Sequence, residues 1–396
     1  MIQPEKRAST LMKARNLKMA RSAQAYVRGS TEQFYDWLES SDGKIPDGPP
    51  IWICGDCHVG NLGSLSDRKG RVAIQIRDLD QTVIGNPAHD LIRLGLSLAS
   101  AARGSDLPGV TTAMILAELM AGYQSALANY SETEKDESFR PKAIQSLLAD
   151  SIRRRWRHLA KDRLEDIHPT IPLGKTFWAL EPAERAQLDE MLAGDEVRVL
   201  LASLKGRAAD KTVEVVDAAY WMKGCSSLGR LRYAALLRIG EGNGSSLCLL
   251  DIKEAVAPAA PRAQNAQMPR DNAARVVAGA KALSPNLGER MASARLLDKA
   301  VVLRELTPQD LKIDLDRLTR DEAIRLARYL AGVVGRAHGR QMETSLRRKW
   351  SNHLTKQQHA SGDAPSWLWA SVVELIALHE TAYLEHCRRF ALSEAA

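Results

Sequence analysis

The chain has 396 residues, of which 45% are hydrophobic, and it carries a formal net charge of +7. This length and composition allow a substantial core, in two domains or in one two-lobed fold. No apolar run is long enough to span a bilayer and no continuous hydrophobic segment opens the chain, so we expect a cytoplasmic protein with no membrane segment. The five cysteines, without a secretion signal, indicate reduced thiols.

Residues 1–50 are predicted to form one or two helices, followed by a polar exit rich in glycine and proline over residues 40–50. Arg28 lies within this segment, in the run Tyr26-Val27-Arg28-Gly29. We expect the Arg28 side chain to place a cation within reach of a phosphate group.

Two short apolar runs are predicted to be strands. The run Pro50–Cys54 indicates a buried strand that delivers the next residues to a loop, and Val72–Ile76 is predicted to be its hairpin partner. Residues 67–70, Asp-Arg-Lys-Gly, are typical of a turn. The polar residues that flank these runs would then meet at one end of a two-stranded ribbon.

Those flanking residues are of the types that phosphoryl transfer needs. A carboxylate orients the attacking hydroxyl, and oxygen ligands hold Mg²⁺. We predict that Asp56 orients the hydroxyl, that Asn61 and Asp78 hold the metal, and that Asp80 binds a second metal ion. Each of these residues alone is also a common turn former. The prediction therefore depends on their combination and their order.

Other residues of this region have plainer explanations. Asp90 precedes a predicted helix over residues 91–101, where we expect it to accept loop N–H groups rather than to act in catalysis. His58 suits a metal ligand or a base, and equally a packed side chain. Cys54 and Cys57 have the spacing of a zinc half-site or a redox pair, but no second pair of ligands accompanies them. A second helix is predicted over residues 110–130.

The sequence resembles the bacterial family catalogued as domain of unknown function 2252, and more distantly the aminoglycoside-phosphotransferase branch of the kinase-like fold. The shared segments are Tyr26–Gly29, then GDCHVGNLG, IRDLDQT and NPAHDLIRLGLSLA. The resemblance implies a kinase-like fold that binds ATP and Mg²⁺. Members of the family usually have Asn-Asp-Phe-Asp where this chain has Arg77-Asp78-Leu79-Asp80, which places a cation beside the presumed metal site.

Residues 131–215 are charged, and we predict a helical insertion that shapes the pocket of a small-molecule acceptor. The run Arg153–His158 combines cations with a tryptophan, as a nucleic-acid groove does. Acids interleave with this run, which is also typical of a solvated helix. Nucleic-acid binding thus remains an alternative that the charge does not decide.

Residues 216–310 are predicted to be the nucleotide-binding lobe. Gly224 to Gly229 form a Gly-x-Ser-x-x-Gly variant of a phosphate-covering loop, in which we expect contacts from Gly224, Ser226, Ser227 and Gly229. An alternating strand from Leu231, a turn over residues 241–244 and a return strand over residues 247–252 follow. Lys253, at the end of the return strand, is predicted to contact the phosphates. Residues 256–270 are predicted to be a mobile loop.

The remaining elements follow the order of a kinase in which the two halves are exchanged. A helix over residues 271–283, a strand over residues 300–306 and an amphipathic helix over residues 320–340 are predicted. In a kinase such a last helix leads directly into the catalytic loop, so we infer a circular permutation. The first of these helices has no central glutamate to pair with Lys253, and Glu254, Asp271 and Glu289 are its candidate substitutes.

The sequence therefore predicts an α+β, two-lobed, protein-kinase-like fold, circularly permuted so that the catalytic-loop lobe comes first and the nucleotide lobe second. Its five segments would be 1–50, 51–130, 131–215, 216–310 and 311–396. The predicted function is an ATP- and Mg²⁺-dependent phosphotransferase with Asp56 and Lys253 in catalysis and an unidentified hydroxyl acceptor. The alternatives are a nucleotide-binding pseudokinase, a regulator that transfers the nucleotide itself, and a basic nucleic-acid-binding protein. The oligomeric state stays open.

Overall fold

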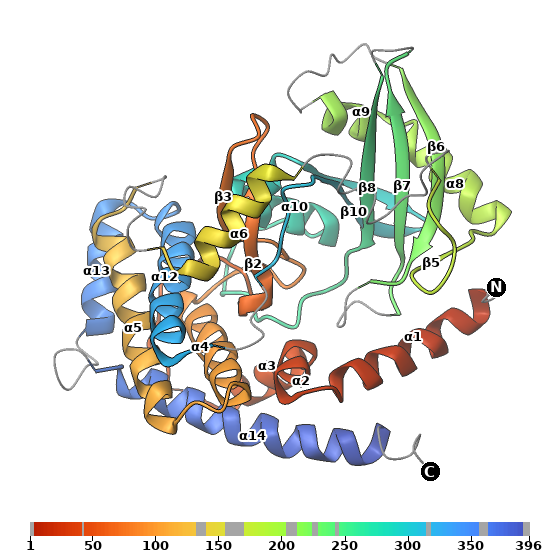
Figure 1. Ribbon diagram of the computed structural model, residues 1–396. Helices are drawn as coiled ribbons and strands as arrows, with labels where there is room; N and C mark the ends of the chain where they lie inside the picture. The colour runs from red at the N-terminus through yellow and green to blue at the C-terminus, as the bar shows by residue number, and fades with distance from the viewer. Residues whose placement is uncertain are drawn as a thin grey trace.

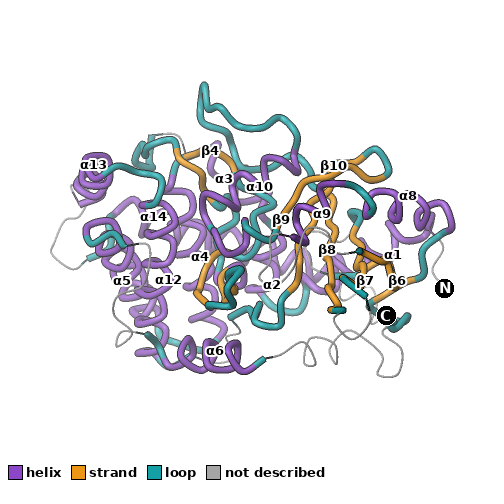
Figure 2. Tube along the Cα trace, turned by 90° about the horizontal axis from the view of Figure 1, so that it is seen from above, coloured by secondary structure: helices purple, strands orange, loops and turns teal. Residues whose placement is uncertain are grey.

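Long helices gather at one end of the molecule and the largest sheet lies at the other end in the computed structural model (Figures 1 and 2). It describes residues 4–41, 43–131, 140–154, 170–202, 212–223, 229–241, 245–313, 318–355 and 363–390. One end, the helical lobe, is built around five long helices, and the other, the sheet lobe, is built on a six-stranded sheet. This mixed composition confirms the α+β class. No helix among the described ranges has the length and apolar character needed to cross a bilayer.

The N-terminal segment forms three helices where the sequence predicted one or two. They are α1 (Pro4–Met19), α2 (Ala23–Gly29) and α3 (Thr31–Glu39). Ser22 separates the first two because its side chain accepts a hydrogen bond from the N–H of Ala25 and so begins a new helix. The hydroxyl of Ser30 bonds back to the carbonyl of Tyr26 where α2 ends.

The predicted strand pairing is wrong. The strand β1 (Ile51–Ile53) pairs with β4 (Val83–Gly85), whereas β3 (Val72–Ile76) pairs with β2 (Leu62–Ser66), which follows the short 3₁₀ helix η1 (Val59–Asn61). The reason is local: the turn at residues 67–70 closes on the strand directly before it. The two-stranded ribbon exists, but its first strand follows the loop instead of preceding it.

The helical lobe gathers helices from both ends of the chain around one hydrophobic core (Figure 1, left). It contains α4 (Pro87–Gly104), α5 (Gly109–Ala128), α12 (Arg320–Gly339), α13 (Thr344–Thr355) and α14 (Ser366–Phe390). The predicted helices over residues 91–101, 110–130 and 320–340 are confirmed, the first being longer than predicted.

The sheet lobe is an antiparallel sheet in the order β5-β6-β7-β8-β10-β9. Its strands are β5 (Phe177–Trp178), β6 (Val213–Trp221), β7 (Arg232–Ile239), β8 (Ser246–Glu254), β9 (Met291–Leu296) and β10 (Lys299–Leu306). The side chains of β7 alternate between the two faces of the sheet. Tyr233 and Leu237 lie on one face, in a core that includes residues of α8 and α9. Arg232 therefore lies on the opposite face, toward the rest of the molecule. The predicted strands here, and the helix over residues 271–283, are confirmed.

Short helices complete both lobes: α6 (Lys142–Arg153), α8 (Pro182–Leu192), α9 (Asp195–Ala202), α10 (Asn272–Leu283) and α11 (Pro285–Gly288). The predicted helical insertion over residues 131–215 is not one unit, because α6 contacts the β2–β3 ribbon while α8 and α9 contact the sheet. The segment also contributes β5 and the start of β6, which the sequence did not predict. Most of the basic run that begins at Arg153 lies outside the described residues.

The helix α1 bridges the two lobes. Arg7 of α1 forms an ion pair with Glu184 of α8 (2.7 Å), while the other end of α1 receives a hydrogen bond from Tyr383 of α14 at the carbonyl of Ala20 (3.2 Å). The first and last helices therefore lie side by side (Figure 1). The segment 256–270 is irregular, and its Ala259 N–H donates to the Gln81 side chain (2.7 Å), which ties it to the segment between β3 and β4.

Candidate active site

The loop after β1 is fixed by a buried carboxylate. Asp90, in the first turn of α4, is fully buried and accepts the N–H groups of Cys54 (2.7 Å) and Gly55 (3.0 Å). Nε2 of His338 on α12 lies 3.1 Å from the same carboxylate. Gly55 has a φ of +75°, and a Cβ atom here would lie 2.2 Å from the Gln81 carbonyl oxygen, so only glycine fits. Asp90 thus has the structural surroundings predicted for it.

Replacing Asp90 by alanine is expected to lower the free energy of unfolding by about 3 kcal/mol or more, because two buried N–H groups lose their acceptor. Urea unfolding followed by circular dichroism measures this change. The exposed Asp36 of α3 offers a matched control, and Asp36→Ala is expected to stay within about 0.5 kcal/mol of the wild type. A change below about 1 kcal/mol for Asp90→Ala would contradict this role.

Asp56 is held by a guanidinium that the sequence analysis did not single out. Nε of Arg93, which is fully buried on α4, donates to Oδ1 of Asp56 (2.9 Å), and its Nη2 donates to the carbonyl of Val27 (2.6 Å). The other carboxylate oxygen of Asp56 lies 3.8 Å from Nε2 of His58. One oxygen of Asp56 is therefore fixed by a hydrogen bond from Arg93, whereas the other makes no hydrogen bond within the part of the chain that the structure describes.

His58 is a packed side chain rather than a cation. Burial lowers the pKa of His58 to about 4, with Asp56 opposing this shift and the nearby cations Arg28 and Arg93 adding to it. The histidine is therefore neutral at pH 7, and its burial beside Asp56 agrees with the packing explanation. Burial likewise lowers the pKa of His379 on α14 to about 4.

These two histidines predict acid sensitivity. The unfolded chain binds protons at histidine near pH 6.5, while the folded protein binds them only near pH 4, so stability falls as the pH drops through this window. We expect about 2 kcal/mol less stability per histidine at pH 5 than at pH 7. Comparing wild type with His379→Gln at both values isolates one of them, with the exposed His353→Gln as control. If His379→Gln and wild type lost the same stability between pH 7 and pH 5, His379 would not contribute to the acid sensitivity.

The predicted metal ligands meet at one end of the β2–β3 ribbon. Asn61 stands just before β2 and Asp78 just after β3, and the N–H of Arg77 donates to the carbonyl of Asn61 (2.7 Å). The side-chain amide of Asn61 donates to the carbonyl of Asp56 (3.0 Å). The structure therefore brings Asp56, Asn61 and Asp78 together as predicted, although the ribbon is not the one expected.

Lys253 reaches this cluster from the sheet lobe. Its Nζ lies 3.5 Å from a carboxylate oxygen of Asp78 and pairs more closely with Asp80. Burial alone would lower the pKa of Lys253, but the two carboxylates raise it. Burial opposes ionisation of Asp78 as well, but Lys253 and Arg232 hold its pKa well below the usual range. Burial and the adjacent Asp78 charge raise the pKa of Asp80.

None of the three substitutes proposed for the missing helix glutamate serves Lys253. Glu254 pairs with Lys299 (3.0 Å), Asp271 caps α10 through the N–H of Ala274 (2.8 Å), and Glu289 lies 3.5 Å from Arg68. The acids that pair with Lys253 belong instead to the ribbon end. The sequence pattern of the helix over residues 271–283 could not reveal these partners of Lys253, because Asp78 and Asp80 are distant from Lys253 in sequence.

The donor set fits Mg²⁺ in kind. The described ranges contain no group of three or more His, Cys, Asp or Glu that would enclose a metal by themselves. Magnesium usually takes only one or two protein carboxylates and completes its coordination with water and phosphate oxygens. Asp78 and Asp80, with the Asn61 side-chain oxygen, match that need, and a cation, Lys253, already stands between the two carboxylates.

The two cysteines of the loop do not point to metal or redox chemistry. Cys54 and Cys57 are buried free thiols. The hydrogen bond to Cys57, together with burial, raises the pKa of the Cys54 thiol. A thiol of raised pKa is a poor nucleophile and a poor metal ligand.

The structure describes only some of the remaining predicted site residues. Gly224, Ser226 and Ser227 lie outside the described residues, while Gly229 has a φ of +100°, a conformation that favours glycine. Arg28 packs its guanidinium on η1, since a Cβ atom at Gly60 would lie 2.8 Å from the Arg28 Cζ atom. Arg28 is therefore beside the loop that carries Asp56, as its predicted role requires.

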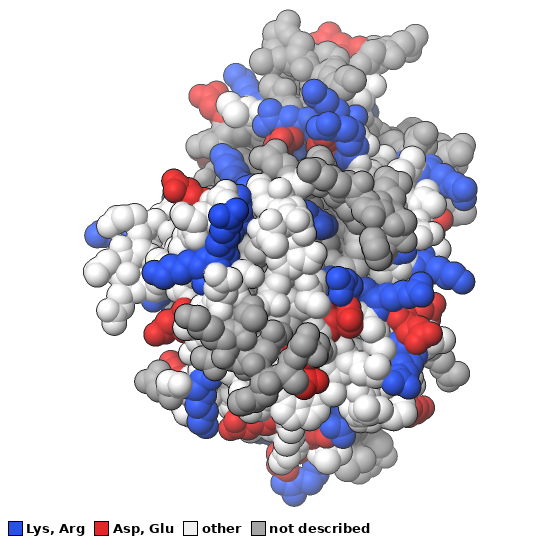
Figure 3. All heavy atoms as spheres, turned by 90° about the vertical axis from the view of Figure 1, so that its left-hand side faces the viewer, with Lys and Arg blue, Asp and Glu red and all other residues white. Residues whose placement is uncertain are grey.

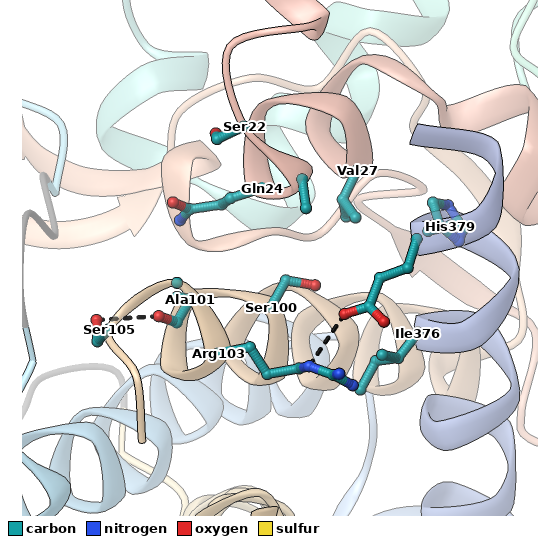
Figure 4. Close-up of a pocket in the computed structure, with 12 residues that line it drawn as sticks. Ser22, Gln24, Val27, Ser100, Ala101, Arg103, Ser105, Ile376 and His379 are labelled. Atoms are coloured by element: carbon teal, nitrogen blue, oxygen red, sulfur yellow. Dashed lines mark hydrogen bonds and ion pairs between the residues drawn. The ribbon is translucent and has the colours of Figure 1, made fainter. Parts of the chain in front are cut away.

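A cavity lies away from the ribbon end that carries Asp78. It has a volume of about 350 Å³ between α2, the end of α4 and α14, with an ion pair between Arg103 and Glu380 (3.0 Å) in its wall (Figure 4). No predicted site residue lines it. Its size alone does not make it the active site, because the convergent charged groups are at the ribbon end.

Comparison with known proteins gave one match. A family model described as "Uncharacterized protein conserved in bacteria (DUF2252)" matches residues 7–389. Neither the curated proteins nor the solved structures contained a match.

Proposed function

We propose that this chain, which belongs to the DUF2252 family of bacterial proteins, is an ATP- and Mg²⁺-dependent transferase of kinase-like fold that modifies a hydroxyl acceptor. One observation carries the proposal. A carboxylate (Asp56), an amide (Asn61) and an acid pair (Asp78 and Asp80) converge at one ribbon end, and a lysine from the facing sheet meets them. These are the parts that phosphoryl transfer uses for the hydroxyl, the metal and the phosphates.

The fold supports a circularly permuted kinase order. The side chain of Gln341, two residues beyond α12, bonds to both backbone groups of Trp52 in β1 (2.8 and 2.9 Å). The end of α12 therefore lies beside the strand that delivers the catalytic loop, where an unpermuted chain would run on directly. The neighbouring positions of α1 and α14 are also consistent with permutation, which is tolerated when chain ends lie close together.

Each residue has a defined task in the proposed reaction. The free oxygen of Asp56 orients the acceptor hydroxyl and takes its proton, while Arg93 keeps the carboxylate in place. Asp78, Asp80 and Asn61 would hold Mg²⁺, which neutralises charge on the phosphates. Lys253 would bind phosphate oxygens, and Arg28 would add a positive charge beside the loop. The resemblance implies phosphoryl transfer, and the orientation of the nucleotide determines which phosphorus is attacked.

A regulatory pseudokinase is the second candidate. The observation that favours it is the pairing of Lys253, which contacts both Asp78 and Asp80 and has no helix glutamate as partner among the described residues. This candidate predicts ATP binding without turnover. A nucleic-acid-binding function has less support, because basic and acidic side chains are interspersed on the face shown in Figure 3.

ATP consumption tests the proposal. The purified full chain is incubated with ATP, Mg²⁺ and pools of hydroxyl-bearing small molecules, with chelation of Mg²⁺ as the control. Consumption that appears with one pool and stops on chelation supports an enzyme. ATP binding without consumption in any pool favours the pseudokinase, and absence of ATP binding would overturn both.

A further inference from the structure

A small charged cavity lies behind Lys253, between the inner face of the sheet and the end of β3. It has a volume of about 60 Å³. Its polar wall consists of Arg77, Asp78, Asp80, Arg232, Asp251, Lys253 and Arg304. Neither Asp56 nor Asn61 is among the described residues that line it. The cavity is therefore next to the proposed metal site but is separate from the carboxylate that orients the acceptor.

Most of these charges are already paired. Arg232 makes a two-pronged ion pair with Asp251 (2.8 and 2.5 Å), and Lys253 faces Asp78 and Asp80. Behind the wall, Arg304 (2.9 Å) shares the buried carboxylate of Asp310 with Arg290.

Arg77 is a cation of the cavity wall for which the described residues show no ion pair with a carboxylate. Its side chain makes one long hydrogen bond, 3.5 Å, to the backbone carbonyl of Asp310, and its buried Nε has no hydrogen-bond partner. Arg77 is half-buried, and a guanidinium that is partly removed from water without an ion pair to a carboxylate is costly, so an anion in the cavity would lower that cost.

We infer that this cavity takes the terminal phosphoryl group of ATP, so that the nucleotide enters with its triphosphate inward. The inference rests on the proposed function and adds the orientation of its substrate. A volume of about 60 Å³ suits a small oxyanion, whereas pockets for larger ligands usually measure roughly 300 Å³ or more. Arginine in a planar fork also matches phosphate oxygens better than a purine.

This orientation decides the group that is transferred. A terminal phosphoryl group beside Arg77 is not the one nearest Asp56, and the α-phosphoryl group lies farther along the chain toward the acceptor. The acceptor oxygen then forms a bond to the α-phosphorus, and the bond from this phosphorus to the α,β-bridging oxygen breaks. Pyrophosphate leaves with the electron pair, the hydroxyl proton passes to Asp56, and the acceptor gains adenosine monophosphate.

Nucleotide binding to the Arg77→Asn variant of the full chain tests the inference. Asparagine is the residue that the family pattern has at this position, and Arg77 contributes little to the hydrogen-bond network, so the fold should persist. We expect the affinity for ATP with Mg²⁺, measured by calorimetry, to fall roughly tenfold. The affinity for AMP, which lacks the outer phosphates, is expected to stay unchanged. Arg71→Asn, at an exposed site of the same ribbon, is the control.

Each other outcome is decisive. Unchanged ATP affinity in Arg77→Asn, or an equal loss for ATP and AMP, would overturn the inference and leave the proposed function standing. Failure of the wild type to bind ATP would remove the proposed function itself. Where turnover occurs, ATP labelled at the α-phosphorus is expected to label the acceptor, and label from the γ-phosphorus on the acceptor would also overturn the inference.

Discussion

An Asp56→Asn variant is expected to turn over ATP at least about a hundredfold more slowly than the wild type, while still binding ATP. General-base catalysis contributes roughly 10²–10⁴ in rate, and asparagine cannot accept the acceptor proton. The amide oxygen still receives the Nε hydrogen bond of Arg93, so the loop should keep its place. Steady-state kinetics with the acceptor found by screening, together with calorimetry for ATP, measures both quantities.

Asparagine is the informative substitution because the surroundings of Asp56 are charged. Alanine would leave the fully buried Arg93 without its carboxylate, at a cost of about 3–5 kcal/mol in stability, which would confuse folding with catalysis. Asp36→Asn on the exposed face of α3 provides the control and should retain full activity. Turnover within a factor of about ten of the wild type in Asp56→Asn would remove this residue from the mechanism.

The second large effect is expected for Asp78→Asn, which should abolish the dependence of ATP binding on Mg²⁺ and lower turnover by roughly a hundredfold or more. The variant removes one of the two carboxylates at the ribbon end. Lys253 keeps its closer partner, Asp80, so the contact between the lobes persists. Calorimetric titrations of ATP with and without Mg²⁺ give the binding difference directly.

Two comparisons sharpen this prediction. Asp189→Asn alters a surface carboxylate of α8 that pairs with Arg185, and it should leave nucleotide binding unchanged. If Asp78→Asn bound ATP with the same gain from Mg²⁺ as the wild type, Asp78 would not be a metal ligand.

Local patterns predicted much of the fold. Alternating residues identified β7, and helical periodicity identified α10 and α12 to within one residue at most ends. The strand predicted over residues 300–306 corresponds to β10. These signals lie inside single segments, so no knowledge of distant residues was needed. The position of Asp90 before an apolar helix likewise predicted its contacts with loop N–H groups.

Pairing between distant segments was not predictable in the same way. The apolar run at β1 fits either a hairpin with β3 or a ladder with β4, and only the intervening strand β2 decides between them. The partner of Lys253 escaped for a similar reason, because Asp78 and Asp80 are more than a hundred residues away in sequence.

The residues that sequence reasoning missed are buried charges. Arg93 carried a usable signal, since a cation within the apolar run Leu91–Leu98 and three residues after Asp90 must find a buried partner. Arg232 and Asp251 carried none that is readable alone, because their pairing depends on the register of β7 against β8. Buried charges in apolar runs are therefore the feature to examine first in related chains.

The most direct test of the account is a calorimetric titration of ATP into the wild-type protein with and without Mg²⁺. We expect saturable binding that Mg²⁺ strengthens, since the metal would join the phosphates to Asp78 and Asp80. Absence of ATP binding under both conditions would contradict the proposed function.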